Sequence, residues 1–273
     1  MTHLHVFLRL FIGKIMNLLF VCMCLFGIGS NTALAAEEAF TNAVGIEFVL
    51  IPSGSFIMGV NNSSQAYPPH KVSISKPFYL GRYEITQKQW QKVMDKNPSR
   101  FKGENNPVEN ISWDDAQEFI ARLNQAEGHS RYRLPTEAEW EFAARGGTTG
   151  PYFFTDKESI KHIELWPYAW FDPNADGKTH PIGQKKPNPF GLYDIYGNVG
   201  EWVQDRWAWP YSPSNPSIDP QGPTESQAMG SNRKNRGGCY ADGHGTSNST
   251  LCDVQEQHIR NRRIGLRLAL SLD

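Results

Sequence analysis

Between residues 148 and 240 the sequence loses nearly every periodic apolar pattern, and this stretch limits the fold more than any other feature. Turn-forming residues alternate there with Trp and Tyr, and strand-like alternation returns only in RIGLRLAL near the C-terminus. The whole chain carries 24 Gly, 18 Pro and 8 Trp. Turn formers combined with large aromatic residues favour an irregular, loop-rich fold whose core is built from a few big side chains.

Regular strands are expected before this stretch. Apolar alternation predicts two short strands within 46–59, on either side of a turn at 52–54, and further strand within 70–86. Apolar runs continue from about Phe48 to Leu270 without a repeat or a low-complexity linker. These patterns predict a single α+β domain with short strands and few helices.

Three segments have the apolar spacing of helices, and each follows a residue that can cap a helix. They are 87–96 after Thr86, 113–128 after Ser112, and 137–147 after Thr136. Glu137, Glu139 and Glu141 crowd the last helix and invite an acid–base role. Glu139 completes a capping box with Thr136, and negative charge in the first turns suits the helix dipole. We therefore interpret these glutamates as structural.

The N-terminus has the pattern of a secretory signal peptide. Arg9 and Lys14 precede a short apolar run at 18–28, and an A-x-A pattern ends at Ala35. This order predicts a signal peptide over residues 1–35. The alternative is an uncleaved anchor helix, which needs roughly 20 apolar residues.

Export sets the expected environment of the remaining chain. The mature protein would be periplasmic or secreted, without stable membrane insertion, and would keep Cys239 and Cys252 but lose Cys22 and Cys24. The formal net charge of −1 and the pI near 6.7 provide no basic surface for nucleic acid. We expect a peptide or small molecule as the binding partner.

Seven ordered blocks cover most of the chain after the predicted signal peptide. They are FVLIPSGSFIMG, PHKVSISKPFYLGRYEIT, NPVENISWDDAQEFIARLN, YRLPTEAEWEFAARGG, KPNPFGLYDIYGNVGEW, RGGCY and IGLRLAL. In this order they resemble the formylglycine-generating enzyme family, also called sulfatase-modifying factors. The resemblance implies one domain over 42–271 with a C-type-lectin-like α+β fold. It does not fix the chemistry, because relatives include copper-dependent oxidases of a sulfatase cysteine, iron-dependent sulfoxide synthases and siderophore-tailoring proteins.

The resemblance also implies a structural calcium site in DIYGNVGEW. By position its ligands would be the side chains of Asp194 and Glu201 and the carbonyl groups of Gly197 and Val199. Carboxylates and carbonyls around a glycine turn are ligands that Ca²⁺ prefers. The alternative is that Asp194 caps a turn and Glu201 is solvated.

A second family calcium site would fall near FDPNADGK. Asp172, Asn174 and Asp176 offer oxygen atoms there, but the correspondence is loose. An acidic turn without metal explains the segment equally well. The eight His residues form no cluster with metal-ligand spacing, which argues against the iron-dependent branch.

The catalytic positions of the family are altered in NRGGCYADG. Members that make formylglycine carry two copper-binding cysteines, and the corresponding positions here are Asp242 and Ser247. Cys239 occupies the position of a serine, and Gly200 replaces an active-site tryptophan. Glu84 matches an acidic residue that lies near the family's pocket. We expect a pocket near Cys239, Glu84 and Asp242, without the standard two-cysteine copper site.

Cys239 and Cys252 can be read in two ways. In an oxidising compartment a disulfide closing this short loop is the simpler state, with a stabilisation on the order of 3 kcal/mol. The alternative is a displaced pair of reactive thiols that binds copper.

Three functions follow from these observations. The first is an exported family member that modifies a peptide or small metabolite, by an oxidative or another reaction. The second is a non-catalytic module that binds a ligand or partner, for which Trp207 and Trp209 would supply aromatic contacts. The third is formylglycine synthesis on sulfatases with displaced cysteines.

Overall fold

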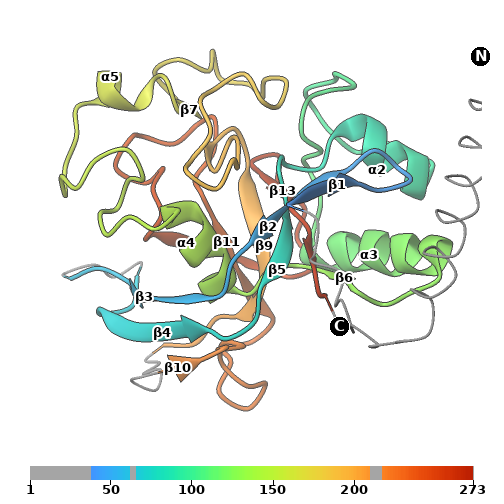
Figure 1. Cartoon of the computed structure of the whole chain (residues 1–273). Coiled ribbons are helices and arrows are strands. Elements are labelled where there is room, and N and C mark those ends of the chain that lie inside the picture. Colours follow the sequence, from blue (N-terminus) through green and yellow to red (C-terminus); the bar gives the residue numbers. More distant parts are fainter. Residues whose placement is uncertain (1–37, 62–65, 210–216, 273) are drawn as a thin grey trace, which may run out of the picture. The chain divides into compact units, whose positions relative to one another are not determined.

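Short strands dominate the computed structural model, which describes residues 38–61, 66–209 and 217–272. The described residues form four sheets (Figure 1). The five-stranded sheet has the order β1 (Ala39–Thr41), β2 (Glu47–Ile51), β5 (Phe78–Gly81), β14 (Ala269–Leu270) and β6 (Tyr132–Arg133). The three-stranded sheet has the order β10 (Ser217–Ile218), β4 (His70–Ile74) and β3 (Gly54–Met58). The predicted signal peptide, 1–35, lies outside the described residues.

A third sheet has four strands. Its order is β12 (Cys252–Glu256), β11 (Asn232–Arg236), β9 (Gly200–Arg206) and β13 (Ile264–Leu266). β7 (Ala169–Trp170) and β8 (Tyr196–Gly197) form a separate parallel pair. The loop-rich prediction for 148–240 is therefore only partly right, because β9 and β11 are regular strands within that range.

The helices begin and end close to the predicted residues. In the described part of the chain they are α2 (Gln87–Met94), α3 (Trp113–Glu127), α4 (Glu137–Arg145) and the short α5 (His162–Leu165). Thr86, Ser112 and Thr136 form the expected N-terminal caps, each as half of a capping box. Gly128 and Gly146 end α3 and α4 in the left-handed conformation, which glycine adopts without a steric penalty. The three predicted helices are confirmed.

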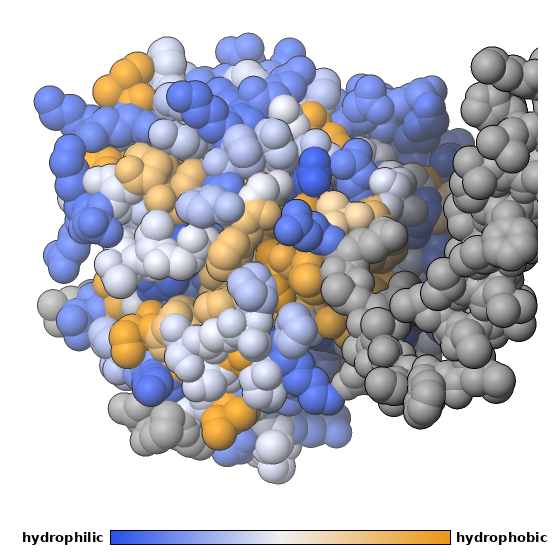
Figure 2. Space-filling view, viewed as in Figure 1, coloured by the Kyte–Doolittle hydropathy of each residue, from blue (hydrophilic) through white to orange (hydrophobic). Residues whose placement is uncertain are grey.

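Large aromatic side chains form the centre of the core, as the composition predicted. Trp140 belongs to one hydrophobic cluster, around α4 and β4, and Trp90 and Trp202 belong to another, around α2 and α3. All three tryptophans are at most 1% exposed. In Figure 1, α3 lies beside β6, and α4 lies between β3 and β11. Figure 2 shows apolar side chains over the middle of one face and hydrophilic ones around them.

A buried ionic network joins α4 to β11. Arg236 contacts Glu137 at 3.2 Å and Glu141 at 2.5 Å. Glu137 also accepts from Lys234 Nζ at 2.7 Å, and Glu141 accepts from Arg145 Nη2 at 2.7 Å. These side chains are all at most 4% exposed. The structural interpretation of Glu137 and Glu141 agrees with this network, because both carboxylates hold a strand against a helix.

Asp205 on β9 lies at the margin of this network. Its Oδ2 accepts a hydrogen bond from the Glu137 backbone N–H at 2.7 Å. Burial, and then the negative charge of Glu137, raises the pKa of Asp205 to about 7. No helix in the described residues is both long and apolar enough to span a bilayer.

Candidate functional site

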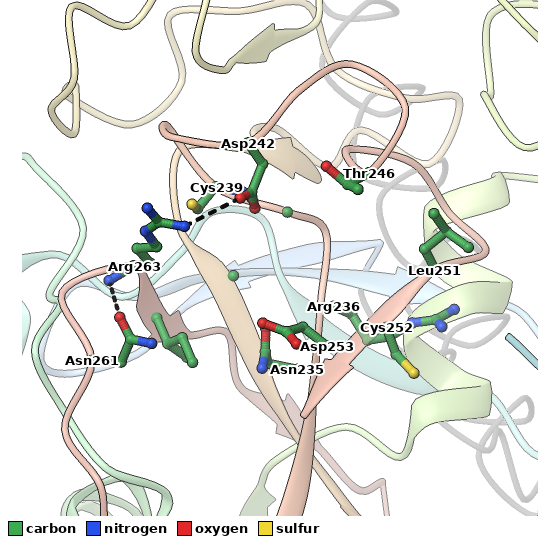
Figure 3. A pocket seen from close by; sticks show the side chains of 13 residues that line it. Asn235, Arg236, Cys239, Asp242, Thr246, Leu251, Cys252, Asp253, Asn261 and Arg263 are labelled. Atoms are coloured by element: carbon green, nitrogen blue, oxygen red, sulfur yellow. Dashed lines mark hydrogen bonds and ion pairs between the residues drawn. The ribbon is translucent and has the colours of Figure 1, made fainter. Parts of the chain in front are cut away.

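A hollow of about 180 Å³ opens on the four-stranded sheet (Figure 3). We call it the Cys239 hollow; its wall includes Gly200, Asn235, Cys239, Asp242, Asp253 and Arg263. These residues come from β9, β11 and β12 and from the loops after β11 and before β13. The sheet and its adjoining loops thus bring together residues that are up to 63 positions apart in the sequence, Gly200 and Arg263.

Two glycines bring Cys239 to the wall of the hollow. Gly237 and Gly238 both have positive φ angles, +96° and +73°. A Cβ atom on Gly238 would lie 2.7 Å from Ser247 Oγ, so a larger residue does not fit there. After this turn the Cys239 backbone N–H donates to Asp242 Oδ2 at 2.9 Å, and the Asp242 N–H donates to the Cys239 carbonyl at 3.0 Å. Cys239 and Asp242 are therefore adjacent, as the sequence predicted.

The surroundings of Cys239 keep its sulfur protonated. The residue is 2% exposed. Burial, and then the negative charge of Asp242, raises the pKa of the Cys239 thiol far above its ordinary range. The positive charge of Arg263 lowers the pKa of Cys239 only weakly. Its Nη1 lies 3.7 Å from Asp242 Oδ1, and about half of its side chain is exposed to solvent. A thiol in this state is a poor nucleophile and a poor metal ligand, because both roles require the thiolate.

Cys252 begins β12 and lines another part of the Cys239 hollow. It pairs with Arg236 across β11 and β12, and burial and then the charge of Glu137 raise the pKa of its thiol to about 11. Cys239 and Cys252 are both free thiols, so the predicted disulfide is absent. The chain turns at Gly237 before it reaches Cys239, and this leaves one sulfur beside Asp242 and the other near Glu137. The two sulfur atoms therefore do not form the converging thiolate pair that a copper site requires.

Asn235 was not predicted to shape the pocket, and Gly200 was noted only as the residue that replaces an active-site tryptophan; both line the hollow. A Cβ atom on Gly200 would lie 2.8 Å from Asn235 Oδ1, so the missing side chain at 200 leaves room over Asn235. Asn235 is 4% exposed, and within the described part of the chain its Nδ2 has no hydrogen-bond partner. Asp253 is its direct cross-strand neighbour. The sequence signal was the lone amide between Lys234 and Arg236, two residues that bind glutamates.

Glu84 does not line the Cys239 hollow. It is 1% exposed and accepts hydrogen bonds from Asn198 Nδ2 at 2.7 Å and from the Val199 N–H at 3.0 Å. Burial, and then the charges of Asp194 and Glu201, raises the pKa of Glu84 well above its usual range. Of the three residues predicted to form the pocket, the structure brings together Cys239 and Asp242. It places Glu84 against Asn198 and Val199, outside the hollow.

The predicted calcium ligands fit an ion only in part. Asp194 is buried in a left-handed turn, its Oδ2 accepts from the Gly183 N–H at 2.6 Å, and its Oδ1 is without a partner among the described residues. Burial raises the pKa of Asp194 to about 6, and a bound cation would favour the charged form instead. Asp194 thus has the free, buried oxygen that a calcium ligand needs.

Glu201 is already occupied by protein groups. Its Oε1 accepts from Arg267 Nη2 at 2.7 Å, and its Oε2 accepts from Trp140 Nε1 at 2.7 Å. Arg267 Nε lies 3.0 Å from both oxygen atoms. Glu201 is therefore not available as a ligand in this structure. Gly197 ends β8 and Val199 directly precedes β9, so both lie between the two carboxylates in sequence.

The second calcium segment does not converge on a site. Asn174 uses its amide within the turn, accepting from the Phe171 N–H and donating to the Ala169 carbonyl. Asp172 and Asp176 are both exposed. In the residues that the structure describes, no three His, Cys, Asp or Glu side chains are grouped so that they could hold a metal ion.

Trp207 and Trp209 line a second hollow, of about 140 Å³, together with Tyr67. Trp209 is 55% exposed, whereas Trp207 is half-buried. Cys252 and Asp253 line this hollow as well as the first. The aromatic residues therefore lie next to the Cys239 hollow, across edge strand β12.

Comparisons with known proteins agree with this architecture. The profile of the sulfatase-modifying factor enzyme 1-like domain matches residues 35–272. The chain is 35% identical to a chaperone protein, LppX, of Paenibacillus barcinonensis over 67% of this chain and 78% of LppX. It is 35% identical to the formylglycine-generating enzyme of Streptomyces coelicolor over half of this chain, but that match spans only 42% of the enzyme.

Solved structures show the same fold. PvdO from Pseudomonas aeruginosa superimposes with a TM-score of 0.76 at 28% identity, covering 87% of this chain and all of PvdO. Treponema denticola variable protein 1 superimposes with a TM-score of 0.75 at 32% identity, covering 86% of this chain and 99% of that protein. The predicted loop-rich, C-type-lectin-like α+β fold is confirmed. The chain belongs to the formylglycine-generating enzyme, or sulfatase-modifying factor, family.

Proposed function

We propose that this protein is an exported family member that binds a peptide or small metabolite in the Cys239 hollow, without thiol-based oxidation. The observation that carries this proposal is the burial of Cys239 against the carboxylate of Asp242, which raises the pKa of its thiol. An oxidase that acts through cysteine needs a thiolate, and a neighbouring carboxylate disfavours that charge.

The wall of the hollow supports binding. It combines the carboxylates of Asp242 and Asp253 with the guanidinium group of Arg263 and the side-chain amide of Asn235. A few polar groups placed around a concave surface are the usual means of orienting a small ligand. Similarity to LppX, which is named a chaperone protein, is in line with a binding role.

Modification of the bound ligand is a second candidate function. The observation that favours it is that Cys239 and Cys252 both line the same hollow. An oxidative reaction would require a rearrangement that brings the two sulfur atoms together and removes Asp242 from Cys239. Formylglycine synthesis with displaced cysteines would need the same rearrangement.

A matched pair of glycine variants tests the proposed function. Gly200→Leu fills the hollow over Asn235, whereas Gly243→Leu adds the same side chain at a nearby glycine with open space around it. We expect ligand-detected NMR with a mixture of short peptides and metabolites to find binders to the wild type. Those binders should be lost in Gly200→Leu and retained in Gly243→Leu.

Oxygen uptake separates the two candidate functions. The copper-treated protein is mixed with a Cys-x-Pro-x-Arg peptide in an oxygen electrode, and the products are examined by mass spectrometry. We expect no uptake and no aldehyde. Uptake that disappears in both Cys239→Ser and Cys252→Ser would contradict the binding proposal and favour oxidative modification.

A further inference from the structure

We propose that Arg206 and Arg233 form a binding site for a phosphate group of a larger molecule. The two arginines are paired across the four-stranded sheet, and neither of them lines the Cys239 hollow. The site is therefore separate from the hollow of the proposed function and can be tested without a ligand there.

The pair places two positive charges next to each other, on β9 and β11. Arg206 and Arg233 are direct cross-strand partners, so their side chains project from the same face of the sheet. Like charges directly opposite each other destabilise a sheet. Burial, and then the positive charge of Arg206, lowers the pKa of Arg233 to about 10. An anion between the two guanidinium groups would remove this repulsion.

Arg233 is buried without a carboxylate partner. It is 8% exposed, and its guanidinium group lies 3.8 Å from the centre of the Trp113 ring. Its Nη1 donates to the Gln204 carbonyl at 2.8 Å, and its Nε donates to Gln257 Oε1 at 3.4 Å. No carboxylate in the described part of the chain forms an ion pair with it, whereas the two other cations of β11 pair with Glu137. A charge held in this way requires a counterion.

The remaining donor of Arg233 is open to a ligand. Its Nη2 forms no hydrogen bond to another described residue. The enclosed polar atoms that lack a partner include Asn235 Nδ2 and Arg236 Nε, but not this atom. An acceptor can therefore reach Arg233 Nη2 from the solvent.

Arg206 can also be reached by a ligand. Its side chain is 24% exposed, and its Nη2 contacts Glu225 at 3.2 Å. The Glu225 side chain is 86% exposed, and exposed ion pairs contribute little to stability. A ligand anion can thus replace Glu225 at Arg206 without breaking a buried contact.

Charge and shape identify the ligand. Two guanidinium groups match an anion with two negative charges, and their planar N–H groups bind phosphate oxygens in pairs. A carboxylate would neutralise only one of the two arginines. The charges of Asp114 and Glu225 oppose an anion, but both residues are exposed and are therefore screened. Because the free donor faces solvent, the site can accept a phosphate group that is attached to a larger molecule.

Methyl phosphate, the smallest phosphate monoester, tests this site. It is titrated into the protein at pH 7.5 and low ionic strength, where it carries nearly two negative charges, and binding is followed by ³¹P NMR. We expect a Kd of about 1 mM or tighter, with acetate at least about fivefold weaker. Inorganic phosphate should bind within about twofold of methyl phosphate. Inorganic phosphate binding about tenfold more tightly would instead identify the free ion as the ligand of the same arginine pair.

Variants of two exposed ion pairs assign the contacts. Arg206→Gln should weaken methyl phosphate at least about fivefold, whereas Glu225→Gln should strengthen it at least about twofold, because a competing carboxylate is removed. Arg122 and Glu118 form a similar exposed pair on α3, and Arg122→Gln and Glu118→Gln are the matched controls that should change neither value. Arg233→Lys keeps the charge but loses the planar fork, and should weaken binding at least about threefold.

Three results would overturn the phosphate site. They are an unchanged affinity in Arg206→Gln, weaker binding in Glu225→Gln, and no saturable binding of methyl phosphate up to about 20 mM. Gly200→Leu, which fills the Cys239 hollow, should leave methyl phosphate binding unchanged. Loss of binding in that variant would place the anion in the hollow, which would also overturn the arginine site while the proposed function stands. Failure of peptides or metabolites to bind the hollow would contradict the proposed function and leave the arginine site supported.

Discussion

Arg236→Met should destabilise the protein far more than the loss of a surface arginine. Arg236 is 1% exposed, and its guanidinium group donates to Glu137, Glu141 and the carbonyl groups of Thr250 and Ser249. Methionine has a similar length but provides none of these donors. The substitution therefore removes the shared cation of the α4–β11 network and leaves its carboxylates buried.

The expected magnitude follows from what remains after the substitution. Removing one partner of a buried ion pair costs about 3–5 kcal/mol. Glu137 keeps Lys234, and Glu141 keeps Arg145, which places the ionic cost at the lower end of this range. Two buried carbonyl groups also lose a donor. We expect a loss of about 4 kcal/mol in the free energy of unfolding.

Urea unfolding followed by tryptophan fluorescence measures this loss. Trp140 reports directly, because the Arg236 guanidinium lies 5.2 Å from the centre of its ring. Arg260→Met is the matched control, since Arg260 makes a two-point pair with Asp115 but has a side chain that is 55% exposed. Exposed pairs contribute at most about 1 kcal/mol.

Similar losses of under 1 kcal/mol in both variants would refute the reasoning. That result would mean that water or a rearranged Lys234 replaces Arg236 at little cost. A large loss in Arg236→Met together with a small one in Arg260→Met would confirm that the α4–β11 contact depends on this cation.

Four further predictions concern titration, thiols, calcium and export. The raised pKa of Asp205 means that its contribution to stability is present below about pH 4 and is lost as the pH rises to 7, by up to about 1.4 kcal/mol per pH unit. Asp205→Asn should therefore gain stability relative to wild type as the pH rises from 4 to 7 in urea titrations; a constant difference over this range would contradict the assigned pKa. Thiol counting on the denatured, unreduced mature protein should find both Cys239 and Cys252 free, and a count of zero would restore the disulfide. Calcium should raise the melting temperature of the wild type through linkage but not that of Asp194→Ala, and no response in the wild type would remove the site. N-terminal sequencing should show that residues 1–35 are absent and that the mature chain begins with AEEAF, whereas a membrane-bound product beginning at Met1 would support the anchor alternative.

Helix ends were predictable because their signals are local. Thr136 and Glu139 lie three residues apart, and their reciprocal bonds need nothing from the rest of the chain. The same holds for Gly146, whose left-handed conformation ends α4. The family resemblance then supplied the fold, because ordered blocks along the sequence reflect a shared topology.

Strand β11 could not be predicted from the pattern of apolar residues. Its sequence, Asn232–Arg236, contains only polar side chains, although most of them are buried. Burial there depends on Glu137 and Glu141, which lie about 95 residues earlier. Without the tertiary pairing, the segment reads as a solvated turn.

The candidate site was predicted in outline but not in detail. Cys239 and Asp242 were found because they lie in one short motif. Asn235 and Asp253 become neighbours only through the β11–β12 register, and no sequence motif marks that register. The disulfide prediction failed for the same reason, since the spacing of two cysteines does not tell which way their side chains face.

The position of β14 has a consequence for how the chain reaches its native state. This strand lies between β5 and β6, so residues 269–270 pair with partners nearly 190 positions earlier as well as with residues 132–133. The five-stranded sheet stays divided until that long-range closure occurs, and such non-local contacts slow folding. Truncation just before β14 should therefore yield a species with two unpaired strand edges, prone to aggregation rather than to partial function.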